Sequence, residues 1–148
     1  MTIEELKDSG AIYFEKITEG MQQYDNQIVR MNEYQAVDKF TELWEACGCK
    51  NVYVDFYYFM LPQEAREQID SVLAYQEREY VHQMEHKEGQ VLFQANEILF
   101  SICSRLNAAE MLFCTIYVTG EYPSTWWGNY NGEYIVFTKR SEERRVGK

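Results

Sequence analysis

Apolar positions in the first part of the chain recur at steps of three and four residues. Thr2 and Glu5 form a capping-box pair, which predicts an early helix start, and Gly10 is suited to end that short helix. Helical spacing then continues as far as Asn32, and it predicts one face of a long second helix. The residues on this face are Tyr13, Ile17, Met21, Tyr24, Ile28 and Met31.

A further helix is predicted between Asn32 and Gly48. Glycine takes the left-handed conformation without steric cost, so Gly48 is suited to end this helix. Its apolar face carries Val37, Phe40, Trp44 and Cys47. Residues 51–59 are then β-branched or aromatic at most positions, which predicts a strand. Both faces of this strand are largely apolar, so we expect it at the centre of a sheet.

The middle of the chain returns to helical spacing. Pro62 suits the first turn of a helix that ends near residues 87–89. Its inward positions are Ile69, Val72, Leu73, Tyr80 and Met84. Another helix is predicted from about Val91 to Leu106, although a strand is an alternative for residues 91–99.

Two more strands are predicted near the end of the chain, over residues 111–119 and 133–138. The segment between them, residues 120–132, is expected to be a loop that closes on Asn131-Gly132, a dipeptide that favours positive φ and reverses antiparallel strands. The element order is ααβααββ. We therefore expect an α+β fold with about four helices packed on one face of a small, mainly antiparallel three-stranded sheet.

Composition adds a strong acidic bias to this picture. The 148 residues carry a formal net charge of −10, and 16% of them are aromatic, which predicts a folded acidic domain rather than a disordered acidic tail. We expect one globular domain over residues 1–138. Residues 139–148 hold five basic and two acidic residues and have no apolar period. This tail resembles a translated adapter sequence, with a disordered basic arm for nucleic acid as the alternative.

The four cysteines and the apolar runs of the sequence bear on the cellular compartment of the protein. Cys103 and Cys114 lie in apolar segments and are predicted to be core residues, and Cys47 and Cys49 are too close for an easy disulfide. We expect a reducing, cytoplasmic location. Acidic residues follow the first apolar ones at once, so we expect no secretory leader, and no apolar run reaches the 18 residues of a membrane span.

One segment resembles a metal-binding motif. Residues 82–86 read H-x-x-E-H, and on a helix His82 and His86 would share a face where they could bind zinc, with Glu85 as general base. The surrounding segment is highly charged, both histidines point away from the predicted core face, and no third ligand is evident. We therefore expect no metal and no cofactor, and keep a small metal-dependent hydrolase as an alternative function.

An aromatic segment and two rows of acids are candidate binding residues. Tyr122, Trp126, Trp127 and Tyr130 fall in the predicted 120–132 loop, where they would either anchor a partner or complete the core. On the predicted helices, one acidic row carries Asp38, Glu42 and Glu45, and another carries Glu67 and Asp70. Carboxylates at helical spacing offer a protein partner something similar to a phosphate backbone, although they could equally be a solubilising surface.

No motif in the chain fixes a reaction. The sequence therefore favours a non-enzymatic acidic protein that occupies a basic partner, such as a nuclease or another nucleic-acid-binding protein. Immunity proteins and anti-defence inhibitors of the anti-CRISPR kind share this charge and size. We expect neither direct nucleic-acid binding nor membrane binding, and the oligomeric state stays open. A structural or regulatory acidic domain is a further alternative.

Overall fold

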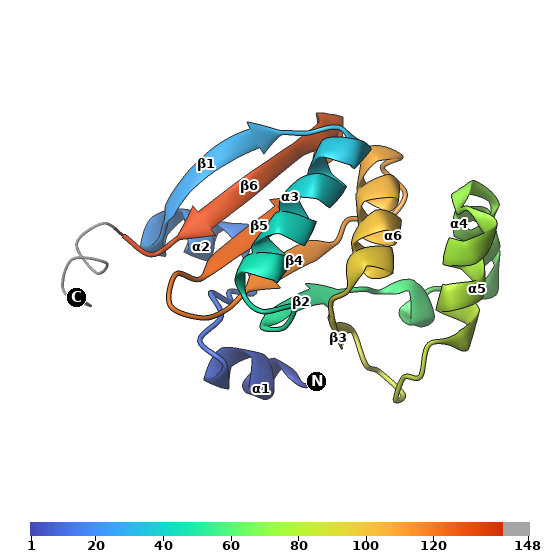
Figure 1. Ribbon diagram of the computed structural model, residues 1–148, viewed down its shortest axis with the longest axis horizontal. Helices are drawn as coiled ribbons and strands as arrows, with labels where there is room; N and C mark the ends of the chain where they lie inside the picture. The colour runs from blue at the N-terminus through green and yellow to red at the C-terminus, as the bar shows by residue number, and fades with distance from the viewer. Residues whose placement is uncertain (141–148) are drawn as a thin grey trace.

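The computed structural model describes residues 1–140, whose strands form one six-stranded antiparallel sheet in the order β1-β6-β5-β4-β2-β3 (Figure 1). The strands are β1 Asp25–Arg30, β2 Val52–Asp55, β3 Leu92–Gln94, β4 Thr115–Val118, β5 Ser124–Gly128 and β6 Glu133–Thr138. The helices are α1 Ile3–Asp8, α2 Ile17–Gln23, α3 Glu33–Ala46, α4 Gln63–Val72, α5 Tyr75–Gln83 and α6 Glu97–Ala108, with the 3₁₀ turns η1 Tyr58–Met60 and η2 Tyr130–Gly132.

One face of the sheet is covered by α3 and α6, which lie side by side in front of the strands in Figure 1. The strand register aligns a row of buried apolar residues beneath these helices. The row consists of Val54, Ile116, Trp126 and Val136. Phe40 of α3 and Phe100 of α6 are fully enclosed and pack on this face. Full burial of such side chains contributes roughly 1.5–3 kcal/mol each, so this layer supplies the main core.

The opposite face is covered by the N-terminal segment. Leu6 of α1 packs against Leu92 and Tyr117. Farther along, Ile12 and Phe14 pack against Ile135 and Phe137 of β6. The Thr125 hydroxyl also donates to the Ile12 carbonyl at 2.6 Å, which fixes this segment on the central strands. The central strands are therefore covered on both faces, whereas the edge strand β1 is largely exposed, and the expectation that only one face is covered is wrong.

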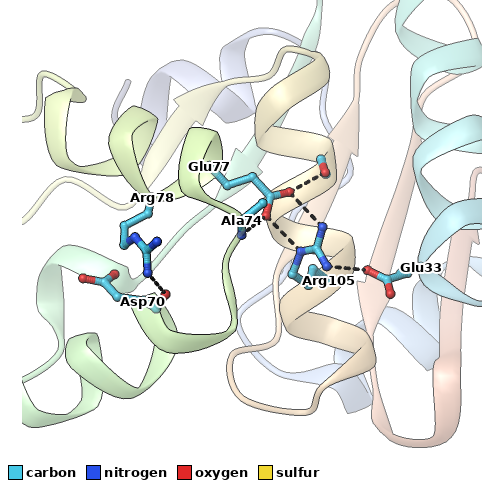
Figure 2. A network of polar contacts seen from close by, with 7 residues as sticks. Glu33, Asp70, Ala74, Glu77, Arg78 and Arg105 are labelled. Carbon is cyan, nitrogen blue, oxygen red and sulfur yellow. Dashed lines mark hydrogen bonds and ion pairs between the residues drawn. The ribbon is translucent and has the colours of Figure 1, made fainter.

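The pair α4 and α5 lies beyond the β2–β3 end of the sheet (Figure 1). Glu77 of α5 ties the pair to the main core, and Figure 2 shows its carboxylate between the two helices that it joins. This carboxylate is bonded to the Arg105 guanidinium of α6 at 2.9 Å and accepts from the Ser101 hydroxyl at 2.6 Å. Arg105 also pairs with Glu33 of α3 at 3.5 Å. One arginine thus connects three helices.

The chain is α+β, but the expected three-stranded sheet with about four helices in the order ααβααββ is wrong. The first error lies at residues 25–30, whose helical spacing with Tyr24, Ile28 and Met31 predicted helix. The Asn26 amide donates to the Tyr24 carbonyl at 3.2 Å. Residues 25–30 then pair along β6, with Ile28 opposite Ile135. Pairing with a strand more than one hundred residues away outweighs a local helical pattern.

The second error lies in the expected loop of residues 120–132, which contains β5. Thr125 and Trp127 face one side of the sheet and Trp126 faces the other, as the two-residue period of a strand requires. The prediction of positive φ at Asn131-Gly132 is confirmed, with φ of 63° and 70°. This turn joins β5 to β6.

The single helix predicted after Pro62 is two helices. Leu73 and Ala74 are extended, with ψ of 147° and 157°, and the Glu77 side chain accepts from the Ala74 N–H at 2.8 Å to cap α5. Downstream, β3 occupies part of the region for which a strand was the alternative. The strand predicted over residues 133–138 and the end of α3 before Gly48, where φ is +72°, are confirmed.

The structure also bears on the expectations about a membrane-spanning segment and about the basic tail. Among the described residues, no helix combines the length and the apolar character that crossing a bilayer requires. Of the basic tail, Lys139 and Arg140 are described, and the Arg140 guanidinium donates to the Gln22 carbonyl. The rest of the tail, residues 141–148, lies outside the described residues.

Candidate functional site

The exposed side of α3 carries an acidic stripe, defined here as Asp38, Glu42 and Glu45. All three side chains are exposed, and Asn32 begins the helix by accepting from the Gln35 N–H at 2.8 Å. Phe40 and Ala36 turn the other side of α3 to the core. The sequence therefore located this stripe correctly, because the apolar period of α3 fixes which side faces solvent.

The charge of the stripe is largely uncompensated. Lys39 approaches Glu42 at 4.0 Å, and it also lies over the Trp126 ring. Within residues 1–140, Asp38 and Glu45 form no ion pair. Several basic side chains are meanwhile bound to other parts of the fold, as Arg30 is to Glu133 at 2.8 Å. The stripe therefore keeps most of its negative charge without a paired cation among the described residues.

The acidic row predicted on the next helix is not one surface. Glu67 is exposed, and its carboxylate accepts from the Gln63 amide at 3.1 Å. Asp70 is instead turned toward the fold, because it accepts from the Tyr58 hydroxyl at 2.8 Å and contacts His82 Nε2 at 2.8 Å. Glu77 is buried. Of the predicted pair on this helix, only Glu67 therefore has an exposed side chain.

The two tryptophans do not form an exposed anchor. Trp126 is 6% exposed and packs edge-on against Phe40, while its indole N–H donates to the Ser124 hydroxyl at 2.9 Å. Trp127 is half-buried on the other face and stacks with Phe14. Both residues complete the core layers on either side of β5. The interpretation that they fold onto the sheet is the one that the structure supports.

Tyr122 and Tyr130 are exposed, but they lie at opposite ends of β5. Tyr122 precedes the strand and is 66% exposed, whereas Tyr130 follows it and is 59% exposed with its ring against Phe113. A five-residue strand separates its two ends by roughly 15 Å, given a rise of about 3.3 Å per residue. The two tyrosines therefore belong to separate surfaces.

The H-x-x-E-H residues do not form a zinc site on one helix face. The helix α5 ends at Gln83, so only His82 is helical. His86 lies in the following segment, where its ring stacks on Phe59 with centroids 3.8 Å apart. Glu85 is exposed. Among the described residues, no group of three or more potential ligands is close enough to hold a metal ion.

Zinc analysis gives a direct test of this geometry. We expect protein purified without added metal to contain far less than one zinc per chain, because the two imidazoles are bound to different neighbours. Elemental analysis measures this ratio. A stoichiometric zinc that disappears in His86→Ala would contradict the expectation and favour the hydrolase alternative.

The histidines nevertheless line one open cleft of about 500 Å³ between η1, α4 and α5. Its other lining residues include Tyr58, Phe59, Arg66 and Asp70. Burial, followed by the hydrogen bond to Asp70, raises the pKa of Tyr58, so its hydroxyl remains a donor to that carboxylate. Sequence analysis found the two histidines but missed Tyr58 and Arg66, which the 3₁₀ turn and α4 bring beside them.

A second perturbed group lies at the end of β2, away from the cleft. Burial raises the pKa of Asp55 to about 6, although its carboxylate accepts a hydrogen bond from the Thr115 N–H that acts in the opposite direction. Burial raises the pKa values of Tyr13, Tyr57 and Tyr117, and the nearby Asp55 charge acts in the same direction. This group lies apart from the predicted site residues, and the apolar pattern of the predicted strand gave no signal for it.

Sequence analysis also missed the exposed aromatic residue beside the acidic stripe. Tyr34 in the first turn of α3 is 71% exposed, and it lies four residues before Asp38 on the same side of the helix. The tyrosine could have been identified from this spacing. Comparisons with protein-family models, with curated protein sequences and with solved structures gave no significant match.

Proposed function

We propose that this chain is a non-enzymatic binding protein that docks a basic surface of a protein partner through the acidic stripe of α3. The observation that carries the proposal is the exposure of Asp38, Glu42 and Glu45 along one rigid helix, with little compensation from the basic residues of the fold. Such an arrangement attracts a basic groove over long range and speeds association.

Tyr34 is the proposed anchor of this surface, in place of the buried Trp126. Tyrosine buries a large area at low cost in conformational entropy, and exposed tyrosines next to charged rims are frequent hot spots. Tyr34 and the acidic stripe lie on the same helix, so they can meet one partner without any rearrangement of the fold.

The class of partner follows from the same physics. Grooves that bind nucleic acid are rich in Lys and Arg and are built to follow regularly spaced negative charge. A nuclease or another nucleic-acid-binding protein therefore fits, and inhibition would follow from occupation of its groove. The acidic surface would repel phosphate, so we propose no direct binding to DNA or RNA. The four free cysteines support a reducing, cytosolic location.

Charge reversal tests the proposal. The triple variant Asp38→Lys, Glu42→Lys and Glu45→Lys is expected to slow association with the captured partner by about tenfold or more at low salt, and to flatten its salt dependence. Truncation by Tyr34→Ala is expected to speed dissociation instead. Surface-based binding kinetics on a partner captured from a lysate by the wild-type chain measure both effects.

A charge-matched control separates a specific site from general repulsion. The variant Glu15→Lys, Glu88→Lys and Glu121→Lys makes the same change in net charge at three exposed positions outside α3. It should associate almost as fast as the wild type. Equal losses in the two triple variants, with both folded by circular dichroism, would show that no particular acidic surface is used and would refute the proposal.

A further inference from the structure

The cleft between η1, α4 and α5 contains Arg66, whose contacts differ from those of the other described arginines. Arg30 and Arg105 pair with carboxylates, and Arg78 and Arg140 donate to backbone carbonyls. Arg66 has no hydrogen-bond or ion-pair partner of these kinds for its side chain within residues 1–140, and its Nε is buried without an acceptor. A buried donor without an acceptor is costly, and in native proteins such a group calls for a partner.

The carboxylate that would usually pair with Arg66 is bonded to other residues. Asp70 lies four residues later on α4, a spacing at which arginine and aspartate normally pair. The Asp70 carboxylate instead accepts from the Tyr58 hydroxyl at one oxygen and contacts His82 Nε2 at the other, both at 2.8 Å. Glu67 accepts from Gln63 and is exposed. Arg66 is half-buried and lines the cleft together with Glu67 and Asp70, but it pairs with neither carboxylate, although the chain has an excess of acid.

The wall of the same cleft is aromatic. The His86 ring stacks on Phe59 with an interplanar angle of 13°, and Tyr58 packs edge-on against Phe59. Val81 lies behind this wall and is fully buried. At about 500 Å³ the cleft has the size of sites that hold small organic molecules rather than a single ion.

We propose that this cleft binds a small organic anion whose phosphate or carboxylate group is held by the Arg66 guanidinium. Guanidinium groups bind such oxyanions through two parallel, charge-assisted hydrogen bonds. The organic part of the ligand packs against the Phe59–His86 stack. This site is separate from the acidic stripe of α3, and it makes the chain a candidate for control by a small metabolite.

Direct titration tests the site with three probes at constant ionic strength: phenyl phosphate, benzoate and inorganic phosphate. Calorimetry measures the dissociation constants, and chemical shift changes locate binding through the signals of His82 and His86. Phenyl phosphate or benzoate should bind more tightly than inorganic phosphate, because only they reach the aromatic wall. The preference between the first two identifies the anionic group. Absence of saturable binding by all three probes would overturn the proposal.

Substitution of Arg66 provides the second arm. We expect Arg66→Gln to weaken binding of the best probe by about tenfold or more, and Arg66→Lys to retain part of the affinity because it keeps the charge without the planar fork. The control Lys50→Gln removes one exposed cation outside the cleft and should leave the affinity unchanged. A folded Arg66→Gln protein that binds as tightly as the wild type would refute the proposal.

Discussion

Replacing Glu77 by alanine is expected to lower the free energy of unfolding by about 2–3 kcal/mol, because it removes several hydrogen bonds to a buried charged group. Glu77 is 5% exposed, and its carboxylate bonds to Arg105, Ser101 and the Ala74 N–H. Its loss leaves Arg105 paired with Glu33 alone and removes the cap of α5. Chemical denaturation at neutral pH measures the change.

Glu79→Ala is the matched control, because Glu79 lies on the same helix and takes part in no ion pair within residues 1–140. Glu79 is half-buried, and because it lacks such a network its substitution should change stability by about 1 kcal/mol or less. Similar losses in the two variants would mean that helix propensity, rather than the Glu77 network, stabilises this part of the fold.

Acid should weaken the same network. Burial acts to raise the pKa of Glu77, but the hydrogen bonds from Ser101, Ala74 and Arg105 outweigh it and hold the pKa below its usual value of 4.5. A carboxylate with a lowered pKa contributes stability above its unfolded-state pKa and loses it as the pH falls through the folded-state value. The difference between the wild type and Glu77→Ala should therefore shrink below about pH 4.5.

Asp55→Asn is expected to raise the free energy of unfolding at neutral pH, by up to about 3 kcal/mol. The Asp55 pKa rises from 3.8 to about 6 because the carboxylate is buried, so folding must bury a charge at neutral pH. Asparagine keeps an oxygen that can accept from the Thr115 N–H, but it carries no charge. Urea denaturation of both proteins at pH 7.5 measures the gain.

The pH dependence of this gain in stability shows whether burial of the Asp55 charge causes it. For an acid with a raised pKa, the favourable contribution of the protonated form is complete below the unfolded-state value of 3.8 and disappears as the pH rises through about 6. The advantage of Asp55→Asn should therefore be small near pH 4 and full above pH 7. The exposed Asp38→Asn variant should show no such change. A constant difference across this range would mean that burial of charge is not responsible.

The sequence predicted those elements whose pattern is set by residues close in the chain. The face of α3 followed from Phe40 and Trp44, and the turn before β6 followed from Asn131-Gly132. It failed for β1, because Ile28 has the spacing of a helical residue and only its pairing with Ile135 shows that it is in a strand. Long-range pairing carries no signature within a short window, which is why β1 was missed.

The same distinction between local pattern and contacts across the fold applies to the candidate site. The exposure of Asp38, Glu42 and Glu45 could be predicted, since it depends only on the helix that carries them. The burial of Trp126 was one of two interpretations that the sequence left open, because it depends on contact with Phe40 of another element. The engagement of Asp70 by Tyr58 could not be predicted. The two histidines match a metal-binding motif in sequence, but they do not lie on one helix because α5 ends at Gln83. Contacts between side chains from different helices and strands could not be predicted from the sequence pattern.

The pairing of β1 with β6 sets the order in which a nascent chain can fold. A ribosome releases Ile12, Phe14 and β1 first, but their partners Ile135 and Phe137 emerge last. The apolar N-terminal segment therefore has no native surface to cover during most of synthesis, and it is open to chaperones and to aggregation. Products that stop before β6 cannot cover this segment, so we expect incomplete chains to be recognised and degraded while complete ones escape.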